Sequence, residues 1–465
     1  MKKTFFKLKF ITAIMLLIGF AVFNIASVKA QVVASGDCGA NGNNLTWNLT
    51  SNGVLTIEGS GAMEDYDRYG APWDYIMGYQ ILTLVIGNNV TTIGDNAFGW
   101  SHQKITSVTL PNSITSIGEE SFYLCRGLTS IDFGNSLISI GKRAFVQCNS
   151  LTSLTIPNSV KTIDIEAFSN CEGLKGTLTI PNSVTTIGYG AFAYCEGLTS
   201  VIIGNSVRAI GSTAFAYCTK LTSITIPSSV ITIGNCPFLG CYLLTEINVD
   251  ANNNNYSSID GVLYNKQQDT LLECPIAKTG TVSIPNSVAK IVDNAFRACK
   301  LTSLIIGNSV ASIGQETFLG CSDLTSITSK AVNPPATSYR SFYYVPVNIP
   351  VSVPCSSENA YKQASGNYGW KDFINYTNCI NNTGLNDIAQ TASIRFYPNP
   401  TTGELRIDNG EMMIESIEIY DLVGRVVFKS PVSQLSQETT IDVSHLSSGI
   451  YFLKVAGKTV KIIKN

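Results

Sequence analysis

Eight of the thirteen cysteines recur at a regular spacing, which makes them the first candidates for chemistry in this sequence. The regular set is Cys125, Cys148, Cys171, Cys195, Cys218, Cys241, Cys299 and Cys321. Their spacing equals the length of a sequence repeat, and no histidine is interleaved as it would be in a zinc site. The pattern predicts an inward ladder of free thiols that act as small buried hydrophobic side chains. Disulfide bonds between the cysteines of stacked coils are the alternative, because successive cysteines would come within bonding distance.

The other residues with catalytic or metal-binding potential are few and scattered. His102 and His445 are the only histidines, and neither stands in the sequence context of a catalytic triad or a metal site. We expect both to be ordinary surface residues. Cys355 and Cys379 lie outside the repeat, where they either form a disulfide with each other or remain separate thiols. The sequence therefore predicts no enzyme, no cofactor and no metal site.

A repeat of about 23 residues sets the cysteine spacing, and one phenylalanine marks each of its nine copies. Each copy opens with a strand of the form L-x-x-I-x-F, in which alternate residues point inward. A PNS or GNS turn, a second short strand and a short helical turn complete the coil. Such coils bury their apolar side only against each other, so the sequence predicts a β-rich α/β solenoid of leucine-rich repeats. Its first strands should form a parallel ladder from about Ile81 to Ile327. The marker residues are Phe98, Phe122, Phe145, Phe168, Phe192, Phe215, Phe238, Phe296 and Phe318.

Two features of the repeat allow more detailed predictions. A glycine follows the second strand in most copies, and we expect it to form a corner with positive φ. Asp164 replaces that glycine with a residue that tolerates the geometry, whereas Val292 does not. One interval also contains an insertion of 35 residues, which includes the stretch "GVLYNKQQDTLLECP". Its two apolar runs around a polar stretch predict a β-hairpin at about 250–280 that protrudes from the stack.

The repeat resembles the BspA-like leucine-rich repeats of bacterial surface proteins, over most of residues 35–380. "CGANGNNLTWNLTSNGVLTIEGSGAMEDY" resembles the N-terminal β-cap of that family, and "NPPATSYRSFYYVPVNIPVSVPC" begins a segment that resembles its closing cap. We accordingly expect an N-terminal cap at 31–80, the leucine-rich-repeat solenoid at 81–330 and a C-terminal cap at 331–380. The repeats specify a fold, but such scaffolds present varied surfaces, so they do not identify a ligand.

Residues 1–30 have the composition of an export signal. Lys2, Lys3, Lys7 and Lys9 precede an apolar run, and a small residue, Ala30, ends a suitable cleavage site. Removal of this segment with its five lysines changes the formal net charge from −2 to −7, which leaves no basic patch for nucleic acid. No later segment is long and apolar enough to cross a bilayer. The mature chain is therefore expected to be exported and to lack a transmembrane span.

A change of composition near residue 381 predicts a linker at 381–391 and a separate C-terminal domain at 392–465. Alternating strands divided by Gly, Asn and Pro turns are typical of a small antiparallel β-sandwich. The domain resembles the C-terminal sorting domain of proteins exported by the type IX secretion system of Bacteroidetes. That resemblance implies contact with the export machinery, passage across the outer membrane, removal of the domain, and release or surface attachment. The matching residues include Tyr397, Pro398, Asn399, Pro400, Gly424, Arg425, Gly449 and Tyr451.

The outward positions of the first strands are the candidate binding face. Small hydroxyls dominate and charge is nearly absent, which suits a broad, weakly polar contact with protein or glycan. Exposed β-branched residues raise the chance of a contact patch. Ser and Thr are also ordinary polar residues of a soluble strand, so the face remains a hypothesis. Its members are Ser107, Thr109, Ser130, Asp132, Ser153, Thr155, Ser200, Ile202, Ser223, Thr225, Ser303 and Ile305.

Two functions follow from these surfaces. The BspA-like resemblance implies a surface protein that mediates adhesion or protein–protein interaction, with host matrix proteins or other bacteria as partners. The alternative is a surface glycan-binding module that serves uptake. Glycan sites usually use exposed aromatic rings, and the strand face supplies none, so such a site would lie at the tyrosines and tryptophans of the caps.

Overall fold

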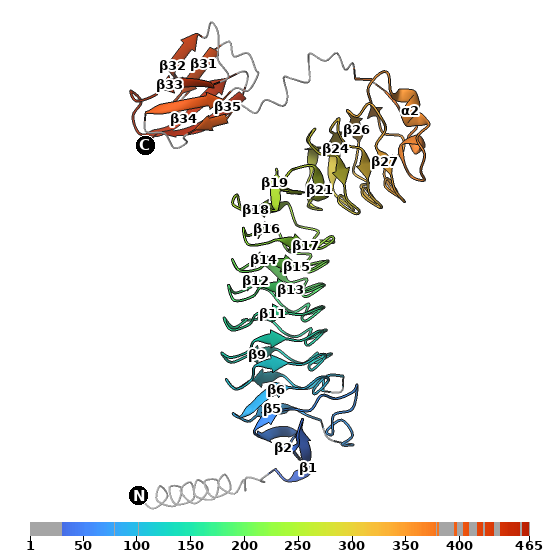
Figure 1. The fold of residues 1–465 in the computed structure, drawn as a ribbon, viewed down its shortest axis with the longest axis vertical. Helices are drawn as coiled ribbons and strands as arrows, with labels where there is room; N and C mark the ends of the chain where they lie inside the picture. Colours follow the sequence, from blue (N-terminus) through green and yellow to red (C-terminus); the bar gives the residue numbers. More distant parts are fainter. Residues whose placement is uncertain are drawn as a thin grey trace, which may run out of the picture. The chain divides into compact units, whose positions relative to one another are not determined.

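The computed structural model describes residues 30–78, 80–100, 102–377, 379–380, 395–397, 403–408, 416–421, 424–431, 438–455 and 458–464. The predicted signal segment (apart from residue 30) and the predicted linker lie outside these ranges. The chain forms two compact units, Met1–Asn378 and Cys379–Asn465. The first unit is a β-solenoid and the second a pair of antiparallel sheets (Figure 1).

An antiparallel cap covers the N-terminal end of the solenoid. It consists of β1 (Val32–Gly39), β2 (Gly42–Thr50) and β3 (Val54–Gly59), with the short β4 (Gly61–Ala62) after it. The last strand of the cap pairs in parallel with β5 (Thr83–Ile86), the first strand of the stack. Terminal coils need such cover because an exposed coil edge presents unpaired backbone groups and apolar side chains.

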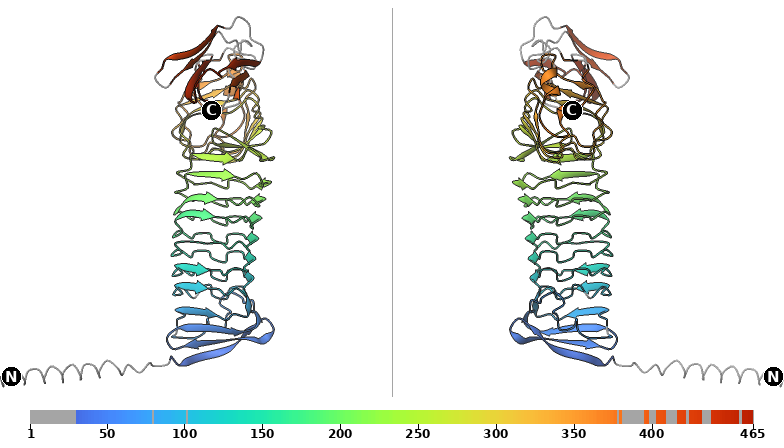
Figure 2. Two further views of the ribbon diagram at one scale, coloured as in Figure 1. Left: turned by 90° about the vertical axis from the view of Figure 1, so that its left-hand side faces the viewer. Right: turned by 90° about the vertical axis from the view of Figure 1, so that its right-hand side faces the viewer.

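Most coils contribute one strand to each of two parallel ladders, and the coils lie as successive layers (Figure 2). The coil at 151–171 is an exception, because residues 151–157 form no strand. The second ladder is the more continuous one, because eight of its strands form a single sheet from β4 to β17. The first ladder is divided into separate sheets. The first-ladder strands are β5, β7 (Ser107–Thr109), β9 (Ser130–Asp132), β12 (Gly176–Thr179), β14 (Leu198–Ile202), β16 (Ser223–Ile226), β18 (Glu246–Val249), β22 (Gly280–Ser283), β24 (Leu301–Ile306), β26 (Ser326–Ser329) and β28 (Val351–Ser352).

The second-ladder strands are mostly two residues long, since only one outward and one inward residue separate the turns of each coil. The expected helical turn at the end of each coil is absent. Within the described residues the only helices are α2 (Glu358–Lys362) and the 3-10 helix η1 (Trp370–Asp372), both in the C-terminal cap. The second-ladder strands are β4, β6 (Val90–Ile93), β8 (Ser116–Ile117), β10 (Ser139–Ile140), β11 (Thr162–Ile163), β13 (Thr186–Ile187), β15 (Ala209–Ile210), β17 (Thr232–Ile233), β23 (Lys290–Ile291), β25 (Ser312–Ile313) and β27 (Ala336–Thr337).

The marker phenylalanines stack through the core. The ring centroids of Phe122 and Phe145 lie 5.1 Å apart, and those of Phe145 and Phe168 are also 5.1 Å apart. The rings of both pairs are nearly parallel. At the N-terminal end Trp73 of the cap continues the stack, 5.4 Å from Phe98. Every ring in the column is buried, so each coil completes the apolar environment of the next.

The recurrent glycine has a different role from the one we expected. None of the glycines at this position has positive φ, and neither does Val292. A Cβ on Gly141 would lie 2.7 Å from the carbonyl oxygen of Ile117, and one on Gly211 would lie 2.5 Å from the backbone of Gly188. The glycine is therefore required because adjacent coils approach closely. Positive φ occurs two residues later instead, as at Arg143.

The insertion does form an antiparallel hairpin, but the hairpin does not protrude. It contains β19 (Tyr256–Ile259), β20 (Val262–Asn265) and β21 (Thr270–Glu273), and β21 pairs in parallel with β23. Leu263 packs in the core of the preceding coils, whereas Val262 and Tyr264 pack in the core of the following coils. Strand β20 thus separates two cores. In Figure 1 the coils before and after it stack along different directions.

The C-terminal unit has the antiparallel sandwich architecture predicted from its sequence. One sheet contains β29 (Arg395–Tyr397), β30 (Glu404–Asp408) and β33 (Glu438–Asp442). The other contains β31 (Ser416–Tyr420), β32 (Val426–Pro431), β34 (Gly449–Val455) and β35 (Lys458–Lys464). Ile407 of the first sheet and Ile419 of the second belong to one buried cluster, so the two sheets share a core.

Replacing Trp73 with alanine should destabilise the N-terminal end of the solenoid by about 3–5 kcal/mol, the usual cost of truncating a large buried aromatic residue. Trp73 also donates a hydrogen bond from Nε1 to the carbonyl oxygen of Ala97 at 2.8 Å. Hydrogen exchange should report faster exchange in the first coils. Tyr75→Ala is the matched control, because Tyr75 is 73% exposed in the same cap. Equal exchange in the two variants would contradict the capping role.

Candidate interaction surfaces

The eight repeat cysteines are buried free thiols, as predicted from their spacing. Each thiol also has a backbone partner. Cys148 Sγ donates to the carbonyl oxygen of Phe122 at 3.3 Å, and Cys171 Sγ donates to that of Phe145 at 3.2 Å. Burial raises the pKa of Cys171 to about 12, which keeps it protonated at neutral pH. The ladder is therefore structural, with each thiol bonded to the preceding coil.

His102 is not a surface residue, so that expectation was wrong. It is buried, and its Nε2 lies 2.7 Å from Oδ1 of Asp74, a residue of the N-terminal cap. The pair joins the cap to the first coil. No sequence pattern indicates it, because the two residues lie far apart in the chain. Across the described residues no group of three or more His, Cys, Asp or Glu side chains could hold a metal ion.

The predicted strand face is a real outward surface. Ser107 lies opposite Ser130 in the parallel register, and Thr109 lies opposite Asp132. Ser200, Ser303 and Ile305 are half-buried, and Ile202 is 55% exposed. The remaining predicted members, all exposed, are Ser107, Thr109, Ser130, Asp132, Ser153, Thr155, Ser223 and Thr225.

The strand face is almost uncharged. Among its described outward positions only Asp132 and Glu246 are charged, and Asp132 accepts a hydrogen bond from the backbone N–H of Gly134. The threonine one position earlier in the repeat has a structural role. The Thr129 hydroxyl, for example, donates to the carbonyl oxygen of Thr106 at 2.8 Å. Sequence reasoning missed Glu246 and its neighbour Asn248, although their alternation with Ile247 could have revealed them.

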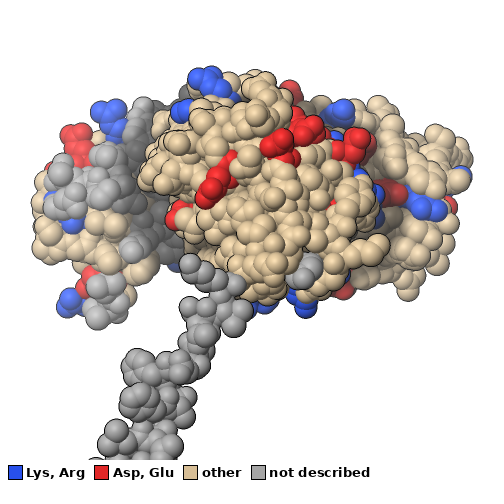
Figure 3. Space-filling view, turned by 90° about the horizontal axis from the view of Figure 1, so that it is seen from below, with Lys and Arg blue, Asp and Glu red and all other residues tan. Residues whose placement is uncertain are grey.

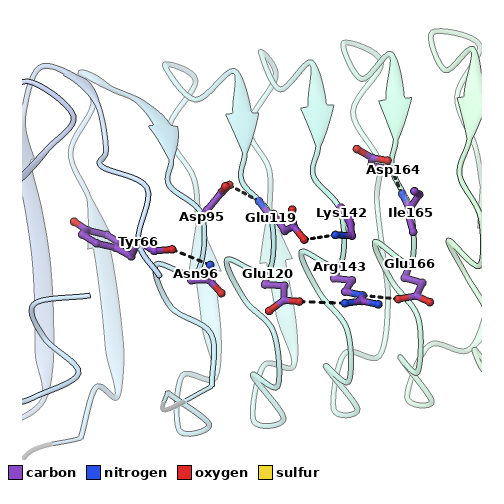
Figure 4. A network of polar contacts seen from close by, with 10 residues as sticks. All are labelled: Tyr66, Asp95, Asn96, Glu119, Glu120, Lys142, Arg143, Asp164, Ile165 and Glu166. Atoms are coloured by element: carbon purple, nitrogen blue, oxygen red, sulfur yellow. Dashed lines mark hydrogen bonds and ion pairs between the residues drawn. The ribbon is translucent and has the colours of Figure 1, made fainter. Parts of the chain in front are cut away.

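A different edge of the solenoid carries a ladder of ion pairs between coils (Figure 4). Arg143 lies between Glu120 and Glu166, with Nε 2.6 Å from the carboxylate of Glu166. Lys142 pairs with Glu119 at 2.5 Å. These charges largely neutralise each other within the chain, so this edge offers few unpaired charges to a ligand.

Tyrosines form an exposed patch in the middle of the solenoid, which sequence analysis overlooked because it considered only the caps. Tyr194 and Tyr217 stack with ring centroids 4.6 Å apart, and Tyr189 and Tyr242 are exposed close to them. Burial, with the neighbouring tyrosines, raises the pKa of Tyr194. The 23-residue interval between Tyr194 and Tyr217 was the signal that could have found this pair.

A second aromatic cluster lies in the C-terminal cap around Arg340. Its guanidinium lies 4.8 Å from the ring centroid of Tyr339 and 4.9 Å from that of Tyr343. Tyr343 also packs against Tyr344 and Tyr368. The cap aromatics proposed from the sequence are thus partly grouped into one cluster. Phe342 does not belong to this surface cluster, because it is buried and stacks on Phe318 in the core.

The N-terminal end of the solenoid is acidic. A band of acidic side chains crosses the end face in Figure 3. The cap supplies Asp37, Glu58, Glu64, Asp65 and Asp67 to the exposed surface. This end is therefore unsuited to nucleic acid or to an anionic membrane.

Of the predicted sorting residues, Pro398, Asn399 and Pro400 lie outside the described ranges. Gly424 has φ of 82°, a conformation that favours glycine, and forms a turn with Asp421 and Arg425. Arg425 Nε donates to Oδ2 of Asp421 at 2.8 Å. Tyr451 is buried and donates its hydroxyl to the carbonyl oxygen of Ser447. These residues therefore shape the domain. Tyr397 and Gly449 lie in β29 and β34.

Cys355 and Cys379 are each disulfide-bonded, in contrast to the eleven free cysteines. Their pairing with each other remains our prediction.

A thiol titration of the native protein should give very low reactivity, because the repeat thiols are buried and protonated. Unfolding in denaturant without reductant should release eleven reactive thiols, the number of free cysteines in the structure. Mass spectrometry under the same conditions should find a single disulfide-linked peptide pair containing Cys355 and Cys379. A disulfide between any two repeat cysteines would contradict the ladder.

Comparison with known proteins identifies both units. A family model described as the BspA type leucine rich repeat region matches in six copies at residues 77–199, 176–268 and 274–364, which is more than half of the chain. A model described as the secretion system C-terminal sorting domain matches residues 395–465. No curated protein matches the chain. Among the described residues no helix has the length and apolar character needed to cross a membrane.

Several solved structures are similar to this chain. A leucine rich cell surface protein from Faecalibacterium prausnitzii A2-165 is 26% identical, with a TM-score of 0.48, and the match covers 76% of this chain and 100% of that one. A leucine-rich repeat protein from Bacteroides ovatus ATCC 8483 is 22% identical, with a TM-score of 0.44, over 68% of this chain and 85% of that one.

Proposed function

Since this chain belongs to the BspA-type leucine-rich-repeat family and ends in a secretion sorting domain, we propose that it mediates adhesion at the bacterial surface by binding another protein. The sorting domain indicates type IX secretion to the cell surface or the extracellular space. Host matrix proteins and proteins of other bacteria are the partner classes. Removal of the sorting domain after export is part of the proposal.

The strand face is the observation that carries this proposal. Its outward residues lie in register between neighbouring strands on either side of residues 151–157, which form no strand and carry the exposed Ser153 and Thr155. Only two of its described outward residues are charged. The hydroxyls of Ser130, Ser153 and Thr155 make no hydrogen bond to other described residues, so they remain available to a partner. A face with so little charge can be covered by a protein at a low desolvation cost. The exposed Ile202 adds apolar contact area.

Glycan binding is the second candidate, and the tyrosine patch is the observation that favours it. Sugar rings stack on exposed aromatic side chains. The exposed tyrosines are Tyr189 and Tyr194 on one coil and Tyr242 two coils further along. Tyrosine is also enriched in protein interfaces, so the patch is compatible with both functions. A glycan array screened with the wild type and with Tyr194→Ala distinguishes the two functions, because glycan binding that requires Tyr194 would be lost in the variant.

Replacing Ser130, Ser153 and Thr155 with lysine should weaken binding of a matrix protein by at least about tenfold, because three charges would enter a contact that lacks counterions. The fold should be unchanged, since all three side chains are exposed. Surface plasmon resonance against a panel of matrix proteins measures the effect. The matched control is the triple variant Thr162→Lys, Thr186→Lys and Thr232→Lys, which places the same charges on exposed positions of the second ladder. Equal loss in both variants would count against the strand face.

Deleting residues 392–465 should leave the protein in the periplasm while the purified solenoid still binds its partner. The sorting domain forms a compact unit of its own and therefore need not contribute to recognition. Cell fractionation and the same binding assay measure the two properties. Loss of binding in the purified deletion variant would place recognition in the C-terminal domain.

A further inference from the structure

The inserted hairpin interrupts the hydrogen bonding between coils. In a regular coil three backbone N–H groups donate to the next coil, as Thr213, Phe215 and Tyr217 do. The equivalent groups after β17 belong to Cys236, Phe238 and Gly240, and none of them makes such a backbone bond within the described part of the chain. The eight-stranded second ladder ends at β17, and β21, which lies in the next sheet, does not pair with it.

Polar side chains replace some of the missing partners. The Tyr256 hydroxyl accepts the backbone N–H of Ile233 at 2.8 Å. The carboxylate of Glu273 accepts the backbone N–H of Phe238. The hairpin supplies both side chains, so the insertion closes the exposed edge that it creates.

A cavity of about 230 Å³ lies at this break. Ile233, Leu272 and Val292 form apolar walls, and Asn235 and Lys290 stand at an exposed rim. Val292 occupies the position that carries glycine in most coils.

Glu273 lines this cavity and is only 7% exposed. Its Oε2 is buried and has no hydrogen-bond partner in the structure. Burial raises the pKa of Glu273 to about 8, although the Phe238 N–H partly offsets that effect. A buried carboxyl oxygen without a partner is costly, and a bound cation would remove this cost.

The other groups around Glu273 do not supply that cation. Burial raises the pKa of Cys236 to about 12, and the pKa values of Cys241 and Cys299 lie well above the ordinary value for the same reason, so these thiols stay neutral. Arg297 is paired with Glu316, and Asp293 accepts the backbone N–H of Gln315. Lys290 makes no ion pair with Glu273 in the described chain.

We propose that this cavity binds a primary ammonium group at the end of a short aliphatic chain, with Glu273 as its carboxylate partner. The apolar walls accommodate the methylene groups, and the buried oxygen accepts the ammonium. A free alkylamine and a lysine side chain share this chemistry. The site is separate from the strand face, so the proposal holds or fails independently of the adhesion function.

Calorimetry of the full chain with butylammonium tests the proposal. Binding should release close to one proton below about pH 7, because the carboxyl must ionise to hold the cation. Affinity should rise about tenfold per pH unit from about pH 6 to about pH 7.5 and level off above about pH 8. Butanol, the neutral analogue, should bind at least about tenfold more weakly. A pH-independent affinity, or equal binding of butanol, would overturn the proposal.

Two variants and one further ligand complete the test. Glu273→Gln should abolish butylammonium binding, whereas Glu246→Gln, at an exposed carboxylate outside the cavity, should leave it unchanged. If Glu273→Gln fails to fold, the proton release and pH profile of the wild type still decide. Nα-acetyl-lysine methylamide distinguishes the sources. Binding as tight as that of butylammonium favours a lysine side chain, and exclusion of the larger molecule favours a free amine. If neither butylammonium nor Nα-acetyl-lysine methylamide bound, the proposed site would be refuted.

Discussion

The solenoid depends on one constraint, which is that no coil can satisfy its own backbone and apolar groups. The phenylalanine of each coil shows how neighbours meet this requirement. Phe145 donates its N–H to Ala167 of the next coil at 2.8 Å, stacks between the rings of two adjacent coils, and accepts the thiol of Cys171. Each bond is modest by itself, but the arrangement repeats at every coil and excludes water throughout. Stability is therefore shared between neighbours, and both ends need a cap.

The same constraint explains the insertion. An additional strand that is out of phase with the repeat cannot satisfy both neighbours, so hydrogen bonding between coils stops on one side. Cys274 partly restores the pattern. It takes the place of a marker phenylalanine, because its N–H donates to Ala295 and its carbonyl oxygen accepts the thiol of Cys299. Among the described residues no ring contact joins Phe238 to Phe296, where the aromatic stack resumes. The result is two cores, a change of stacking direction and one buried carboxyl group.

Most of the fold could be predicted from the repeat, because its period places the same type of side chain at the same depth in every coil. That is why the thiol ladder and the outward serines could be assigned from spacing alone. Contacts between residues that do not belong to the repeat could not be predicted in this way. His102 meets Asp74, and Glu273 meets Phe238, through segments whose relative position depends on how the coils stack. The recurrent glycine was assigned to backbone conformation although close approach of coils requires it, because one sequence does not separate these two reasons.

Hydrogen–deuterium exchange of the intact protein tests the central claim, that each coil is held by its neighbours and that the insertion is the point where this support is interrupted. Slow exchange is expected in the coils from Phe98 to Phe215 and from Phe296 to Phe342. Clearly faster exchange is expected at Cys236 and Gly240, whose N–H groups lack their usual carbonyl partners. Uniform protection across the insertion would show one continuous stack and contradict the account.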